Sequence, residues 1–175
     1  KYKEYMNTIA LCGGGTAGHV MPAVALIPCL KKHFDNIVFI GGKNGIERDI
    51  ARKLNLEYYG VTSSKLSRRI TLKNLAIPFA ITKGVIEAKK ILKKLQPRVV
   101  FSKGGYISLP TVIAAAMLKI PVVAHESDLT PGLANKICSK FCAAVCTSFY
   151  ECRYKFKRGI YTGSPIREEL FSGSG

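Results

Sequence analysis

Four glycines and a histidine follow the first apolar segment of the chain, in the stretch LCGGGTAGHVMP at residues 11–22. Glycines at this density let backbone N–H groups approach an anion, and a helix that begins directly after them adds the positive end of its dipole. That dipole also disfavours the protonated form of His19, and a neutral imidazole beside an anion site is suited to act as a general base. The stretch therefore predicts an anion cradle next to a catalytic base.

A second loop of the same kind, SKGGYIS at residues 102–108, follows another short apolar segment and precedes another amphipathic one. The carboxyl ends of parallel strands meet at one edge of a sheet, which is where such sheets bind ligands. Two glycine loops at that edge suit a diphosphate better than a single phosphate. We therefore expect the two loops to lie side by side.

A dinucleotide site is the main alternative, because Gly13-x-Gly15-x-x-Gly18 matches the nucleotide-binding fingerprint. That fingerprint also requires an acidic residue at the end of the second strand to hold the ribose. Here the second strand ends in FIGGKNG, with no Asp or Glu at its tip, and Asp35 lies before the strand. An NAD-dependent oxidoreductase is thus disfavoured, and titration with the cofactor would test it.

The stretch HESD at residues 125–128 ends a third apolar segment, so its polar side chains are expected at the same edge of the sheet. A histidine and two carboxylates at one strand end suit contacts with a substrate. A turn-capping role for Asp128 is the simpler alternative.

Short β-branched segments alternate with longer amphipathic ones along the chain, which predicts an α/β fold. Its core is a Rossmann-like parallel sheet with helices on both faces. The predicted strands cover residues 7–12, 36–42, 98–102, 120–126 and 143–148, and the predicted helices cover 18–33, 45–55, 71–95, 108–118 and 131–141.

The chain of 175 residues has a formal net charge of +16, which favours an anionic partner. One segment mixes cations with apolar side chains, as a contact with an anionic membrane surface requires. A basic loop above an ordinary core helix remains the alternative. Neither aromatic stacking platforms nor a recognition motif points to nucleic acid. The predicted membrane contacts are Lys65, Arg68, Arg69, Leu72, Lys73, Leu75 and Phe79.

Six cysteines stand at positions 12, 29, 138, 142, 146 and 152 without the paired spacing of a metal site. We expect reduced, buried thiols and no bound metal.

Four stretches in order, GGGTAGHVMPAVAL, FSKGGYISLP, IPVVAHESDLTPGLANK and TGSPIREE, resemble the successive motifs of the MurG family. The resemblance implies a GT-B architecture, in which two Rossmann-like domains face each other across a cleft. It implies an inverting transfer of N-acetylglucosamine from UDP-GlcNAc, in peptidoglycan synthesis, with no cofactor and no essential metal. The acceptor would be the C4 hydroxyl of undecaprenyl-diphospho-N-acetylmuramoyl-pentapeptide, at the cytoplasmic face of the cell membrane, to which the protein would bind peripherally.

The resemblance also assigns roles to individual residues. His19 would be the catalytic base. Ala17 stands where a glycine is common in the family, and Asp128 where an Asn is frequent, so both contacts depart from the family pattern. The donor-binding residues would be Thr16, Ala17, Gly18, Asp128 and Arg167; the acceptor diphosphate would lie on Gly14, Gly15, Gly104, Gly105 and Tyr106; His125 and Glu126 would be further substrate contacts.

The predicted domain organisation follows from the same comparison of motifs. Residues 1–163 would form the N-terminal acceptor- and membrane-binding domain, and residues 164–175 the start of an interdomain linker. The donor domain would lie beyond this sequence, so the chain alone is expected to be inactive in glycosyl transfer. A non-catalytic membrane-recruitment subunit of a split glycosyltransferase is the alternative from another class.

Overall fold

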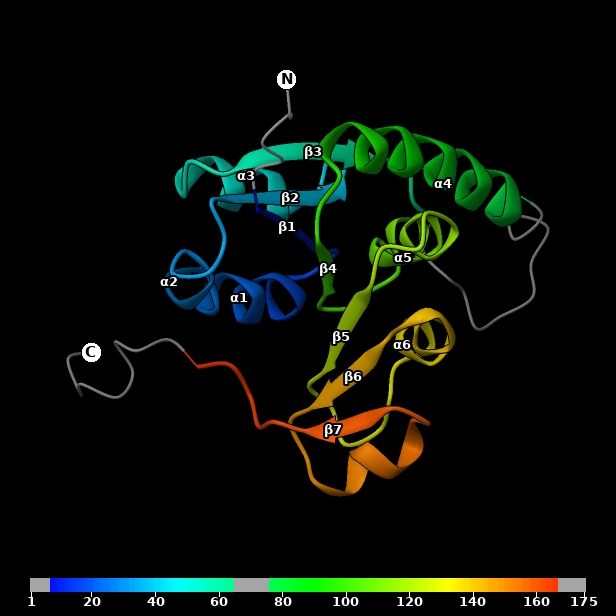
Figure 1. The fold of residues 1–175 in the computed structure, drawn as a ribbon. Coiled ribbons are helices and arrows are strands. Elements are labelled where there is room, and N and C mark those ends of the chain that lie inside the picture. Colours follow the sequence, from blue (N-terminus) through cyan, green and yellow to red (C-terminus); the bar gives the residue numbers. More distant parts are fainter. Residues whose placement is uncertain (1–6, 65–75, 167–175) are drawn as a thin grey trace.

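A computed structural model describes residues 7–64 and 76–166, and within them seven parallel strands form one sheet (Figure 1). The strand order is β3-β2-β1-β4-β5-β6-β7. The strands are β1 (Thr8–Cys12), β2 (Asn36–Gly42), β3 (Glu57–Val61), β4 (Val99–Ser102), β5 (Val122–Glu126), β6 (Ala144–Thr147) and β7 (Gly159–Tyr161).

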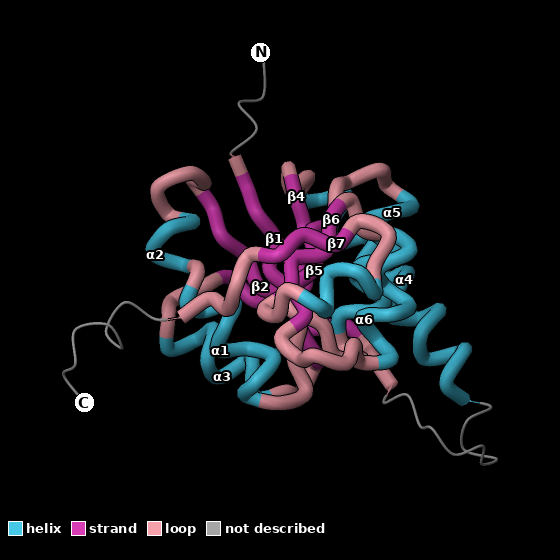
Figure 2. Tube along the Cα trace, turned by 90° about the horizontal axis from the view of Figure 1, so that it is seen from below, coloured by secondary structure: helices cyan, strands magenta, loops and turns pink. Residues whose placement is uncertain are grey.

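Helices cover both faces of the sheet, as the sequence predicts (Figure 2). One face carries α1 (Ala17–Ala25), α2 (Ile27–Leu30) and α3 (Ile46–Lys53). The other carries α4 (Ala76–Leu95), α5 (Ser108–Met117) and α6 (Leu133–Cys138). Two short 3-10 helices, η2 (Ser139–Phe141) and η3 (Glu151–Lys155), complete the described elements.

Successive side chains along each strand point to opposite faces of the sheet, and this divides the core between the two layers of helices. In β1, Leu11 packs with the α1 to α3 layer, whereas Ala10 packs with the α4 to α6 layer. Successive side chains of a strand point to opposite faces, so a strand covered on both faces is apolar throughout. Helix α4 contributes the buried Ala88 and Leu92 of its apolar face. The amphipathic pattern therefore placed this helix correctly against the sheet.

Three predicted elements differ from the structure. The helix expected at 18–33 is two helices, α1 and α2, because Pro28 in the first turn of α2 lacks the N–H that would continue the helix. The helix expected at 131–141 begins only after Pro131 and Gly132 and ends in the 3-10 turn η2. Strands β3 and β7 were missed, since β3 is interrupted by Gly60 and β7 has 3 residues, two of them exposed.

The strand order reverses between β1 and β4, which are neighbours although far apart in sequence. Their register pairs Cys12 with Ser102, so both strands end at the same level. Open α/β sheets bind ligands in the crevice at such a switch point. The fold therefore sets the two glycine loops next to each other.

Candidate active site

The two glycine loops are in direct contact at the carboxyl edge of the sheet. The N–H of Lys103, in the second loop, donates to the carbonyl oxygen of Cys12, directly before the first loop, at 2.9 Å. Gly15 has φ +91°, and a Cβ atom built on it would lie 2.9 Å from Cε1 of Tyr106. A larger residue at position 15 would thus be strained and would push the tyrosine ring away. The prediction that the two loops meet is confirmed.

Gly104 brings the second loop against α6. Its φ is +92°, and a Cβ atom there would lie 2.5 Å from Oδ1 of Asn135. Asn135 is buried, and its Nδ2 donates to Oε2 of Glu126 at 3.0 Å. The second loop therefore packs closely against Asn135, a residue for which the only signal in the sequence was an amide in the segment after HESD.

Glu126, at the end of β5, organises the loop that follows it. Its Oε1 accepts a hydrogen bond from the N–H of Asp128 at 3.0 Å. Its Oε2 accepts from the N–H of Gly132 at 3.1 Å, in addition to the Asn135 amide. Glu126 is 4% exposed, and its buried carboxylate holds the turn after β5 together. Asp128, in that turn, is exposed to solvent.

His125 ties the end of β5 to the segment after β7. It is buried, and its Nε2 lies 3.1 Å from the carbonyl oxygen of Gly163. Since a carbonyl only accepts, Nε2 carries the proton, and Nδ1 is buried without a partner among the described residues. Burial lowers the pKa of His125, and the nearby Lys103 ammonium acts in the same direction, against the Gly163 hydrogen bond and Glu126.

Lys103, in the second glycine loop, is a buried cation to which the sequence assigned no role. Its side chain is 1% exposed. Burial lowers its pKa, and the carboxylates of Glu126 and Asp128 act in the opposite direction. A positive charge at this depth adds to the attraction that the glycine loops exert on an anion.

Glu47 is a further functional candidate to which the sequence assigned no role. This residue of α3 is fully buried, and its Oε1 accepts from the N–H of Gly42, at the tip of β2, at 2.8 Å. Its Oε2 lies 3.4 Å from the N–H of Gly15. An acid thus does reach the tip of the second strand, but it binds backbone amides there. Its signal was a carboxylate in the first turn of the helix after a glycine-rich loop.

A groove of about 600 Å³ lies between the first loop, the β2–α3 loop and the segment after β3. Gly15 and Tyr106 form its wall on the glycine-loop side. We call it the loop groove. Its remaining lining residues are Gly42, Lys43, Asn44, Gly45, Ile46, Val61, Thr62, Ser63, Ser64 and Ile107.

The structure describes the other predicted site residues to different extents. Thr16 is the exposed N-cap of α1 and makes no side-chain capping bond, so its hydroxyl is available at the cradle. His19 lies in the first turn of α1, while the side chains of Ala17 and His19 lie outside the described part of the structure. Arg167 also lies outside it. The roles of these residues stay predictions.

Of the predicted membrane contacts, Phe79 alone lies within the described residues. Phe79, on α4, is 80% exposed, and Ile86, two turns further along, is 52% exposed. Lys83 and Lys90 line the same hollow of about 610 Å³. We call this surface the α4 patch. Lys65, Arg68, Arg69, Leu72, Lys73 and Leu75 lie outside the described residues.

All six cysteines have free thiols, as expected, but Cys29 is exposed, so the expectation of uniform burial was wrong there. Within residues 7–64 and 76–166, no group of three or more His, Cys, Asp or Glu side chains is placed to hold a metal ion. Nor does any helix of that part have the length and apolar character needed to cross a membrane.

A parallel sheet of this order, with paired glycine loops at its switch point, is the Rossmann-like N-terminal half of a GT-B protein. The glycosyltransferase family 28 N-terminal domain matches residues 9–147. The chain belongs to this family.

Curated relatives confirm the resemblance to the MurG family. The chain is 53% identical over 175 residues to a protein of Clostridium perfringens (strain SM101 / Type A), and 51% identical over 172 residues to one of Clostridium botulinum (strain Alaska E43 / Type E3). Both are named UDP-N-acetylglucosamine–N-acetylmuramyl-(pentapeptide) pyrophosphoryl-undecaprenol N-acetylglucosamine transferase. The matches cover 99% and 97% of this chain but 48% of each relative, so the chain spans about half the length of the relatives it matches.

Solved structures of other proteins have a similar fold. The crystal structure of Acinetobacter baumannii MurG is 26% identical, with a TM-score of 0.77, over 94% of this chain and 47% of that one. The UDP-GlcNAc 2-epimerase of Neisseria meningitidis is 14% identical with a TM-score of 0.63, over 91% of this chain and 46% of that chain, which shows a shared fold.

Proposed function

We propose that this chain is the acceptor-binding half of an inverting glycosyltransferase. The enzyme transfers N-acetylglucosamine from UDP-GlcNAc to the C4 hydroxyl of undecaprenyl-diphospho-N-acetylmuramoyl-pentapeptide. The family membership and the names of the relatives support this assignment. The observation that carries the acceptor site is the contact of the two glycine loops, where Gly15 lies beneath Tyr106.

In this proposal the acceptor diphosphate lies on the glycine loops. The positive end of α1 and the buried ammonium of Lys103 balance its charge. Placed there, the diphosphate holds the muramoyl sugar close to the start of α1, where His19 stands. His19 takes the proton of the C4 hydroxyl as its oxygen bonds to the anomeric carbon of N-acetylglucosamine. UDP leaves with the electron pair of the broken bond, so the configuration inverts.

The donor is held in part by residues of this chain, with Thr16 at the N-cap of α1 and Asp128 at the rim as its contacts. Ala17, Gly18 and Arg167 are its further contacts on this chain, and the rest of the donor pocket belongs to the half of the relatives that this chain does not span. The α4 patch, with Phe79 and Ile86 between lysines, would contact an anionic membrane surface at the cytoplasmic face.

Binding of a soluble short-lipid acceptor analogue to the chain tests this function. Thr16→Asp adds a negative charge to the cradle while keeping a good N-cap, so the helix should still form and acceptor binding should weaken about tenfold or more. Thr16→Ser is the matched neutral control and should bind nearly as well as the parent. UDP-GlcNAc and NAD are titrated beside the acceptor. NAD binding, or equal acceptor binding by both variants, would contradict the proposal.

A further inference from the structure

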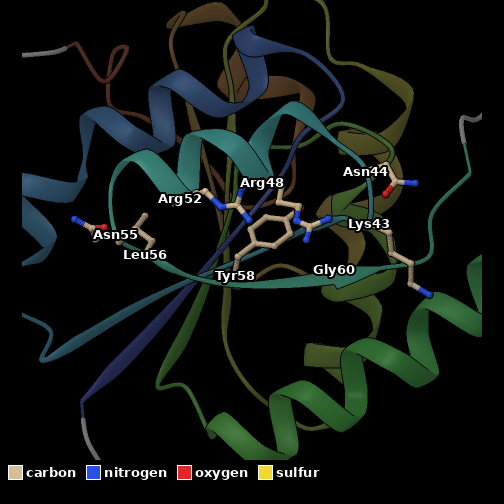
Figure 3. Close-up of a pocket in the computed structure, with 8 residues that line it drawn as sticks. All are labelled: Lys43, Asn44, Arg48, Arg52, Asn55, Leu56, Tyr58 and Gly60. Atoms are coloured by element: carbon tan, nitrogen blue, oxygen red, sulfur yellow. The ribbon is translucent and has the colours of Figure 1, made fainter.

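A second hollow, of about 710 Å³, lies on the outer edge of the sheet between α3 and β3 (Figure 3). We call it the edge pocket. Among the described residues, no carboxylate lines it. Its lining residues are Lys43, Asn44, Arg48, Arg52, Asn55, Leu56, Tyr58 and Gly60.

The edge pocket and the loop groove share part of their lining. Lys43 and Asn44, in the β2–α3 loop, line both hollows. In Figure 3 they stand at one end of the edge pocket, while Asn55 and Leu56 stand at the other. Because Leu56 precedes β3, that far end lies toward the amino ends of the strands. A ligand held in the loop groove can therefore extend around the β2–α3 loop and back along the sheet edge.

Two uncompensated guanidinium groups face this path. Arg48 and Arg52 stand one turn apart on α3, and both side chains reach toward the ring of Tyr58 (Figure 3). Within the described ranges, neither forms an ion pair with a carboxylate, whereas Lys43 is paired with Glu87 at 2.8 Å. Like charges four residues apart on a helix destabilise it. An anion between the two arginines would remove that repulsion.

The floor of the edge pocket is rigid. The Tyr58 ring stacks on Phe39, with centroids 6.2 Å apart and an angle of 14° between the planes. Its hydroxyl donates to the carbonyl oxygen of Gly42 at 2.5 Å. β3 is the edge strand, and no described strand pairs with its outer side. An unpaired strand edge beside a long pocket suits an extended peptide better than a compact anion.

We propose that the edge pocket binds the peptide of the acceptor, with its free carboxylate end between Arg48 and Arg52. This inference rests on the proposed function, since it extends the acceptor from the glycine loops into the neighbouring pocket. It assigns to α3 a role in selecting an acceptor that carries an anionic peptide.

Three soluble acceptor analogues with the same diphospho-sugar test the inference on the 175-residue chain. The first carries a pentapeptide with a free C-terminal carboxylate, the second the same peptide as its C-terminal amide, and the third no peptide. The parent should bind the carboxylate form about tenfold more tightly than the amide. Arg48→Gln/Arg52→Gln should abolish this preference and leave binding of the peptide-free analogue unchanged. Arg98→Gln, at the amino end of β4, is the matched control and should keep the preference.

The outcomes separate this inference from the function on which it rests. If the double variant kept the preference for the carboxylate form, or if the parent bound all three analogues equally, the peptide would lie elsewhere while the acceptor site stood. If the double variant lost affinity equally for all three, the arginines would serve the diphosphate instead, and the inference would be wrong. If the parent bound none of the analogues, the proposed function and this inference would both fall.

Discussion

Glu47 reaches from α3 to the end of β2, where its Oε1 accepts a hydrogen bond from the N–H of Gly42 at 2.8 Å. Cβ atoms at Gly14 and Gly41 would lie 2.5 Å from this side chain, so glycines surround the carboxylate. One buried side chain thus joins the first glycine loop to the β2–α3 loop. The loop groove owes its shape to this contact.

Removal of the Glu47 side chain should therefore remove the hydrogen bonds that hold both loops and destabilise the fold. Glu47→Ala leaves the buried amide of Gly42 without its acceptor and opens a cavity, so the free energy of unfolding should fall by about 2–4 kcal/mol. Asp49→Ala is the control, because Asp49 is an exposed acid in the first turn of the same helix. Urea unfolding of both variants measures the difference. Equal losses would show that only the helix dipole is involved.

The contact between Gly15 and Tyr106 predicts a second effect on stability. Gly15→Ala should cost about 1–3 kcal/mol, from its positive φ and from displacement of the tyrosine ring. In a chain that already carries Tyr106→Ala, Gly15→Ala should cost less free energy of unfolding, because the ring no longer obstructs the new methyl group. The part of the cost that comes from backbone strain should remain. Gly132→Ala is the control, since no atom lies within 4 Å of a Cβ there. A double-mutant cycle in urea that showed strict additivity would contradict the contact.

Burial of His125 makes stability depend on pH. Its pKa is lowered in the folded chain, so as the pH falls below its ordinary value the unfolded chain binds the proton first. Its contribution is complete above that value and is lost at lower pH, with a slope of up to about 1.4 kcal/mol per pH unit. Urea unfolding between about pH 5 and pH 8 should show this slope reduced in His125→Gln. The exposed His33→Gln should retain the slope of the parent; a parallel profile for both variants would argue against the assignment.

Thiol reactivity should separate the cysteines by burial. Cys29 is exposed, while burial raises the pKa of Cys138 to about 12 and that of Cys142 to about 11. Since the thiolate is the reactive form, one of the six thiols should react rapidly with a disulfide reagent in the native chain. Cys29→Ser should remove that fast phase. Cys146 is half-buried and should react more slowly; rapid reaction of a buried thiol, at position 12, 138, 142 or 152, in this variant would show that the core opens readily.

The membrane contact proposed for the α4 patch can be tested by substitutions on that surface. Phe79→Glu/Ile86→Glu replaces two exposed apolar side chains with charges, so partition onto anionic vesicles should fall at least about tenfold. Met117→Glu changes an exposed apolar residue at the end of α5 and is the control. Co-sedimentation with vesicles measures both. Equal partition of the two variants would place the contact elsewhere.

The sequence by itself determined the fold class and the position of the two glycine loops. Strand and helix periodicity are local, and Gly15 and Gly104 stand in loops whose neighbours in sequence reveal them. Resemblance of ordered motifs then identified the family, as the match over residues 9–147 confirmed.

Only the tertiary structure decided which side chains complete the site. Glu47 lies 33 residues from Gly14, and Asn135 lies 31 residues from Gly104, yet each fills the space that a glycine leaves open. Such contacts depend on how α3 and α6 pack on the sheet, which no local pattern encodes. The edge pocket is similar, because among the described residues no carboxylate lies within ion-pair distance of Arg48 or Arg52, which only the folded chain reveals. Burial and pairing are properties of the folded chain, and so the charge balance of the site follows from packing.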